Sequence, residues 1–154
     1  MSLQWTDGLS VGVPEIDGQH RELIERLNRL VTALQRNDRA ELTRLMSFLG
    51  AYVVEHFTAE EMQMLATGYP GYAEHKAQHA AFVSEYVNLK ALLETEGSTA
   101  TLTLKLSSTL SSWLVRHIYG NDIKLGAHLR VRGAAKQAGL PALPGRLAAR
   151  SRLT

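Results

Sequence analysis

The chain has 154 residues, of which 45% are hydrophobic and 21% are charged, a composition typical of one globular domain. It contains no cysteine, which excludes disulfide scaffolds, thiolate-bound metal centres and thiol catalysis. The first residues have no signal-peptide pattern, and nowhere do 18 apolar residues run together. We therefore expect a cytoplasmic protein with no membrane span.

The formal net charge of +2 hides an uneven distribution of charge. Residues 129–154 contain six basic residues and no acidic one, whereas residues 1–128 hold the other 11 basic and all 15 acidic residues, a formal charge of −4. We expect a folded domain over residues 1–128 and a basic tail with prolines and glycines over residues 129–154. The tail is interpreted as a flexible extension, or else as a segment that docks to an acidic protein or an anionic surface. Nucleic-acid binding is not predicted, because the tail has no aromatic residue and no known binding motif.

Four consecutive segments have apolar residues at the spacing of an α-helix, and none alternates with the period of a strand. Asp17 is the expected N-cap of the first helix, and Asp38, with a glutamate three residues later, has the capping-box pattern that opens the second. Gly68 is the expected C-cap of the second helix, and Ser98 or Thr99 caps the fourth. Short connections between four helices favour an all-α, up-down-up-down antiparallel four-helix bundle.

Five of the six histidines lie alternately near the start and near the end of successive helices. In an up-down bundle these positions meet at one end, and each continues the apolar stripe of its helix, so the side chains point inward. Buried polar groups without partners cost about 1–3 kcal/mol each, and a metal ion would satisfy them together. Any single histidine, or one i,i+4 pair, has an ordinary structural explanation, whereas convergence of five favours a metal site. The five are His20, His56, His75, His79 and His117, and His128 is expected to face solvent.

Two carboxylates complete the predicted ligand set. Glu60 lies one helical turn after His56, and Asp122 lies five residues after His117. Five residues rotate a regular α-helix by about 140°, so we expect the helix to end at Gly120–Asn121 and Asp122 to turn back over the site. Seven ligands are too many for a structural zinc ion and too rich in nitrogen for calcium or magnesium. Two octahedral ions that share both carboxylates and one solvent atom would keep one position open for an external ligand.

These motifs resemble those of the hemerythrin family, most closely its single-domain bacterial members, from Trp5 to about His128. The resemblance implies two iron ions (Fe²⁺/Fe³⁺) with a bridging oxo or hydroxo group. It also implies that three histidines hold one iron, two hold the other, and both carboxylates bridge them. The matching motifs are Ile16-Asp17-Gly18-Gln19-His20, His56-Phe57-Thr58-Ala59-Glu60-Glu61, the pair His75 and His79, and Trp113-Leu114 followed by His117-Ile118 and Asp122.

The resemblance further implies reversible dioxygen binding for storage, transport or delivery, by a binding protein rather than an enzyme. The alternatives are an oxygen- or redox-sensing regulatory module and a di-iron enzyme that acts on peroxide or nitric oxide. Apolar residues near the predicted ligands are candidates for lining a dioxygen pocket, and three polar neighbours are candidates for orienting imidazoles. The apolar candidates are Ile24, Phe57, Leu114 and Ile118, and the polar ones are Gln19, Glu61 and Tyr119.

Overall fold

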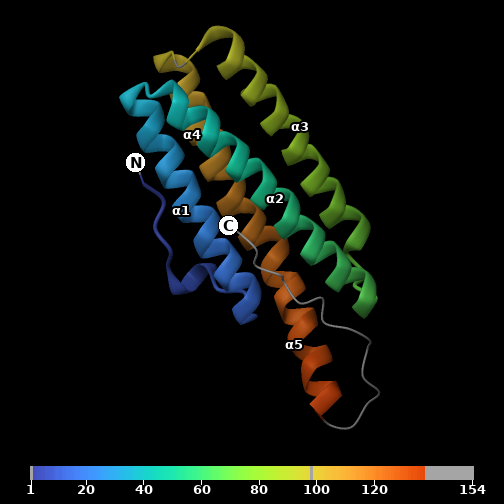
Figure 1. Ribbon diagram of the computed structural model, residues 1–154. Helices are drawn as coiled ribbons and strands as arrows, with labels where there is room; N and C mark the ends of the chain where they lie inside the picture. Colours follow the sequence, from blue (N-terminus) through green and yellow to red (C-terminus); the bar gives the residue numbers. More distant parts are fainter. Residues whose placement is uncertain (1, 98, 138–154) are drawn as a thin grey trace, which may run out of the picture.

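The computed structural model describes residues 2–97 and 99–137 and confirms the antiparallel four-helix bundle (Figure 1). Its long helices run up, down, up and down, and within the described residues there is no strand. The last long helix continues without a break through a five-residue π-helical segment into a further helix, which extends beyond the end of the bundle. The elements are η1 (Asp7–Leu9), α1 (Pro14–Arg36), α2 (Arg39–Thr67), α3 (Tyr72–Glu96), α4 (Ala100–His117), η2 (Ile118–Asp122) and α5 (Ile123–Gln137).

The helix ends follow the capping signals of the sequence at three predicted positions. The side chain of Asp38 accepts a hydrogen bond from the amide of Glu41 at 3.0 Å, and the hydroxyl of Thr99 accepts one from the amide of Leu102 at 3.1 Å. Gly68 ends α2 in the left-handed conformation with φ 63°, which glycine adopts without strain. Ser98 lies outside the described residues.

The predicted N-cap of the first helix is wrong, because α1 begins at Pro14 after Val13. Proline suits the first position of a helix, where its missing N–H would have no partner in any case. Asp17 is instead buried, and its carboxylate accepts hydrogen bonds from the amide of Val11 at 2.7 Å and from the hydroxyl of Ser10 at 2.6 Å. The carboxylate thus holds the N-terminal segment against α1.

The N-terminal segment is also held by α5. The guanidinium of Arg130 donates to the carbonyl of Val11, and Gly126 lies so close that an added Cβ would collide with that carbonyl. The helix therefore continues past residue 128, and the boundary expected there falls inside α5. Residues 129–137 of the expected tail are helical as part of α5, and residues 138–154 lie outside the described residues.

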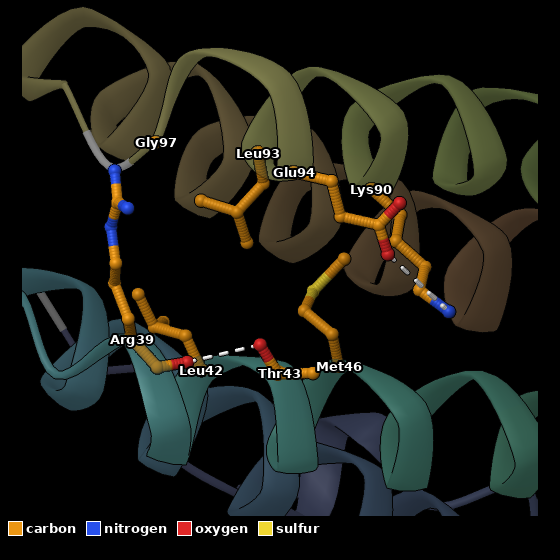
Figure 2. A pocket seen from close by; sticks show the side chains of 8 residues that line it. All are labelled: Arg39, Leu42, Thr43, Met46, Lys90, Leu93, Glu94 and Gly97. Atoms are coloured by element: carbon orange, nitrogen blue, oxygen red, sulfur yellow. Dashed lines mark hydrogen bonds and ion pairs between the residues drawn. The ribbon is translucent and has the colours of Figure 1, made fainter.

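The apolar stripes of the helices meet along the axis of the bundle, where Leu30, Leu106 and Ile118 are fully buried. A cavity of about 230 Å³ lies between α2 and α3, at the end where α2 begins and α3 ends (Figure 2). The predicted ligands lie at the opposite end and do not line it. No helix in the described part of the chain is long and apolar enough to cross a membrane. The cavity is lined by Arg39, Leu42, Thr43, Met46, Lys90, Leu93, Glu94 and Gly97.

Candidate metal centre

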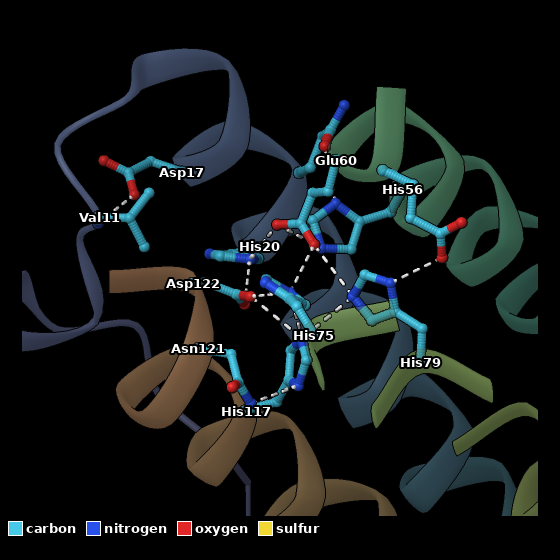
Figure 3. A network of polar contacts seen from close by, with 12 residues as sticks. Val11, Asp17, His20, His56, Glu60, His75, His79, His117, Asn121 and Asp122 are labelled. Carbon is cyan, nitrogen blue, oxygen red and sulfur yellow. Dashed lines mark hydrogen bonds and ion pairs between the residues drawn. The ribbon is translucent and has the colours of Figure 1, made fainter. Parts of the chain in front are cut away.

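The structure brings all seven predicted ligand residues together at one end of the bundle (Figure 3). Their exposed fractions lie between 0 and 3%, so the cluster is shielded from solvent. Each helix supplies part of the set because the residues lie near alternating helix ends, as the up-down topology requires. The members are His20 from α1, His56 and Glu60 from α2, His75 and His79 from α3, His117 from α4 and Asp122 from η2.

Asp122 reaches the cluster by a route that differs from the predicted one. The helix does not end at Gly120–Asn121 but widens into the π-helix η2, in which the amide of Ile123 bonds to the carbonyl of Ile118. Residues five apart share a face where hydrogen bonds span five residues. Asp122 therefore faces the cluster, with its Oδ1 3.0 Å from Nε2 of His117.

The ligand atoms form two groups that share a carboxylate. Within each group, all ligand atoms lie within 4.8 Å of one another. One group contains three histidines and the other two, as the division implied by the resemblance requires. The first group is Glu60, His75, His79 and His117, and the second is His20, His56, Glu60 and Asp122.

Glu60 turns a different oxygen toward each group. Its Oε2 lies 3.2 Å from Nε2 of His79, and its Oε1 lies 3.6 Å from Nε2 of His56. Asp122 does the same, with Oδ1 3.0 Å from Nε2 of His75 and Oδ2 3.1 Å from Nε2 of His20. Each carboxylate can therefore offer one oxygen to a cation in either group.

Unsatisfied polar atoms at the centre of the cluster fit a bound cation. Both oxygens of Glu60 and both oxygens of Asp122 are buried and have no hydrogen-bond partner among the described residues. The Nε2 atom of His117 lies 3.0 Å from that of His75 and 3.1 Å from that of His79. Three imidazole nitrogens aimed at one point beside carboxylate oxygens form a donor set that suits a transition-metal ion.

The pKa values in the cluster reflect burial opposed by close opposite charges. Burial lowers the pKa of His56 to about 4 and also lowers that of His117. Burial acts the same way on His75, but the close negative charges of Asp122 and Glu60, 3.0 and 3.5 Å from its Nε2, outweigh it and raise the pKa to about 9. Burial would raise the pKa of both carboxyls, yet the surrounding imidazoles hold Glu60 at about 2 and Asp122 well below its ordinary value. The metal-free cluster therefore keeps both carboxylates ionised.

Polar side chains contact the outer nitrogen of three clustered imidazoles. Gln19 Oε1 lies 2.7 Å from Nδ1 of His56, and Glu61 Oε1 lies 3.0 Å from Nδ1 of His79. Both residues are among the predicted orienting residues, whereas the third, Tyr119, is 51% exposed. Asn121, expected only at a helix end, has its side-chain amide nitrogen 3.2 Å from Nδ1 of His117 and was not predicted to orient an imidazole. Its spacing of four residues from His117 was the available signal.

A small apolar cavity of about 20 Å³ lies one helical turn from the cluster. One lining residue on each helix lies three positions from a clustered histidine: Leu23, Val53, Phe82 and Leu114. Phe57 also lines the cavity and stacks on His79, with ring centroids 3.8 Å apart. The other two pocket candidates, Ile24 and Ile118, are buried but do not line this cavity.

His128 is only partly exposed, whereas the prediction placed it in solvent. It is half-buried, its Nε2 lies 3.0 Å from the hydroxyl of Thr67, and its ring packs edge-on against Tyr69. The cause is the continuation of the helix as α5, which carries His128 along the end of α2 instead of releasing it into a tail.

The fold and the buried cluster define a class, the antiparallel four-helix proteins with a cation-binding site at one end of the bundle. Residues 11–129 match the Hemerythrin HHE cation binding domain. Bacteriohemerythrin of Stenotrophomonas maltophilia (strain R551-3) is 33% identical over 141 residues, which cover 89% of this chain and 90% of that protein. The hemerythrin-like protein of Naegleria gruberi is 30% identical over 78% of this chain and 87% of its own length. A crystal structure of wild-type hemerythrin superposes with a TM-score of 0.76 at 28% identity and covers 84% of this chain and 98% of that one. The chain belongs to the hemerythrin family.

Proposed function

We propose that the chain binds dioxygen reversibly at two iron ions held by the seven clustered residues. His75, His79 and His117 would hold one iron, His20 and His56 would hold the other, and Glu60 and Asp122 would serve both. The observation that carries the proposal is that both carboxylates turn one oxygen to each histidine group. Such a pair of ions, with its oxo or hydroxo bridge, would supply the electrons for reversible dioxygen binding.

The asymmetry of the histidines supports a place for an external ligand. The group with two imidazoles offers its ion one protein ligand fewer than the group with three. Apolar walls beside it would exclude water and protons, which otherwise convert an oxygenated site into an inactive oxidised one. We assign Leu114 and Phe57 to these walls because they line the apolar cavity, and Ile24 and Ile118 to the packing behind it.

Dioxygen titration of the iron-loaded, reduced protein tests this function. We expect a visible charge-transfer band that saturates at one dioxygen per two irons and disappears when the solution is purged with inert gas. Irreversible oxidation without a stable oxygenated form would contradict reversible binding and favour a redox sensor or an enzyme acting on peroxide or nitric oxide.

Metal content of ligand variants tests the assignment of residues. His56→Ala and His117→Ala each remove an imidazole from a different group, so neither variant is expected to retain two irons per chain. His128→Ala is the matched control, because this histidine bonds to Thr67 outside the cluster, and it should load two irons. Two irons in either ligand variant would overturn the assignment.

A further inference from the structure

A short aromatic path links the cluster to the surface beside α5. Tyr69, in the turn between α2 and α3, packs edge-on against His75 with ring centroids 6.4 Å apart. On its other side, Tyr69 packs against His128 of α5 at 5.1 Å. Both Tyr69 and His128 are half-buried, so the path ends at solvent. Neither side chain has a role in the proposed dioxygen site.

Positive charge gathers where this path reaches the surface. Lys124 and Arg132 lie four residues before and after His128, so the three share one face of α5, which we call the basic face. Lys124 and Arg132 are exposed. No acidic residue occurs after Asp122 anywhere in the sequence. Burial, Asp122 and Glu74 together raise the pKa of Tyr69, so these two acidic groups lie near the path, and the guanidinium of Arg130 is turned toward Val11.

The side chains of Lys124 and Arg132 make no hydrogen bond or ion pair with another described residue, whereas His128, which lies between them, contacts Thr67 and Tyr69. α5 buries Leu125 and Gly126 against the bundle, whereas Val131, five residues after Gly126, is 70% exposed. Figure 1 shows the second half of this helix extending past the ends of the other helices. Two exposed cations without a counter-ion among the described residues are suited to a partner of opposite charge, because complementary charge speeds docking.

We propose that the basic face docks an acidic one-electron donor protein, and that electrons enter the metal cluster past Tyr69 and His75. This inference rests on the proposed function, since an oxygen-binding iron pair that oxidises needs a reductant to restore it. Each reduced donor loses one electron and converts one ferric ion to ferrous, so two donors restore the pair. One proton from water converts a bridging oxide to hydroxide.

Another aromatic side chain reaches the cluster but lacks the charged surroundings. Trp113 stacks on His117 with ring centroids 4.3 Å apart and is half-buried on α4. Residues 100–117 contain two lysine or arginine residues, Lys105 and Arg116, whereas the 15 residues of α5 contain four, and neither helix has an acidic residue. We therefore place the docking site of the acidic donor beside Tyr69 rather than beside Trp113.

The part of the proposal that concerns docking is tested on the metal-free full-length protein, with a plant-type [2Fe–2S] ferredoxin as the acidic donor. Stopped-flow association should be fast at low ionic strength and slow with added salt. The double variant Lys124→Glu/Arg132→Glu should lower the association rate about tenfold. The matched control Lys105→Glu/Arg116→Glu places the same charges on α4 and should leave the rate unchanged. Equal rates for both double variants would overturn the proposal, as would binding to phosphatidylglycerol vesicles without binding to ferredoxin.

The electron path is tested on iron-loaded, oxidised protein. Tyr69→Leu should slow reduction by ferredoxin severalfold and leave reduction by a small neutral reductant unchanged. Tyr72→Leu is the control, because this neighbouring tyrosine makes no ring contact with a clustered histidine among the described side chains. Slowing by Trp113→Leu but not by Tyr69→Leu would overturn the path. A protein that loads no iron contradicts the proposed function, whereas one reduced by the small reagent but no faster by ferredoxin contradicts only this inference.

Discussion

The carboxylate of Glu61 lies 3.0 Å from Nδ1 of His79. Because His79 turns Nε2 to the cluster, its Nδ1–H donates to this negatively charged carboxylate. His56 has a neutral partner instead, the amide oxygen of Gln19 at 2.7 Å. The two histidine groups therefore differ in the charge behind them as well as in the number of imidazoles. An anionic partner makes an imidazole a stronger ligand and stabilises the more highly charged metal ion.

Glu61→Gln keeps an acceptor for His79 but removes its charge. We expect a higher midpoint potential of the iron pair, because the ferric state loses a stabilising charge, whereas Glu61→Ala should lower metal affinity about 10–100-fold. Lys76 is the internal control, since its Nζ lies 3.4 Å from Glu61 and partly neutralises it. Lys76→Gln should shift the potential in the opposite direction to Glu61→Gln. Spectroelectrochemical titration measures both shifts, and shifts of the same sign would contradict a role through charge.

Metal binding near pH 7 should release a proton from His75. Its pKa of about 9 means that His75 is protonated in the metal-free protein, and only a neutral imidazole binds metal. His56, with a pKa of about 4, is already neutral and releases none. Calorimetry of Co²⁺ binding in two buffers of different ionisation enthalpy counts the protons. Proton release should disappear above pH 9 and in His75→Gln, and release that persists in this variant would contradict the assignment to His75.

The metal-free protein should lose stability on both sides of pH 6.5, the ordinary pKa of histidine. The raised pKa of His75 stabilises the fold below pH 6.5, and this contribution is lost as the pH rises through about 9. The lowered pKa of His56 acts in the other direction, so its contribution is present above pH 6.5 and lost as the pH falls through about 4. Thermal unfolding against pH measures both limbs. His75→Gln should remove the loss of stability at alkaline pH and keep the loss at acid pH. The reverse result would contradict the assignment of the alkaline loss to His75 and of the acid loss to His56.

Gly126→Ala should detach the N-terminal segment from α5. An added Cβ would collide with the carbonyl of Val11, so we expect a loss of about 1–3 kcal/mol in the free energy of unfolding. Gly18→Ala is the matched control, because Gly18 lies inside α1 with nothing within 4 Å of an added Cβ. That variant should gain up to about 1 kcal/mol from helix propensity. Urea unfolding compares the two, and equal stabilities would show that Gly126 tolerates a side chain.

The sequence predicts the bundle and the cluster because both depend on local spacing. Caps such as Asp38 and Gly68 mark helix ends, and the i,i+4 pairs place ligands on inner faces. Asp17 and His128 were misassigned because their partners, Val11 and Thr67, come from other segments of the chain. Pro14, three residues before Asp17, was the local signal for an earlier helix start, but it does not show that the carboxylate of Asp17 accepts from the preceding loop.

The π-helix was missed because glycine followed by asparagine is also typical of a helix that ends. The sequence-based prediction still brought Asp122 to the correct place, since it began from the requirement that Asp122 join His117. Two geometries satisfy that requirement, a chain that turns back and a helix that widens by one residue. The structure has the second, and α5 keeps the direction of α4 as a result.

Changing the length of η2 by one residue should therefore have opposite effects. Deletion of Gly120 places His117 and Asp122 four residues apart, where a regular α-helix keeps both on one face, so the protein should still load two metal ions. Insertion of one alanine after Gly120 places the two residues six apart. Asp122 is then rotated about the helix axis by about 100° from its present position, five residues after His117 in the π-helix. This variant should lose metal, and α5 should lose its contact with Val11. Metal analysis with circular dichroism separates loss of the site from loss of helix. A chain that turned back at Gly120 would instead tolerate the insertion better than the deletion.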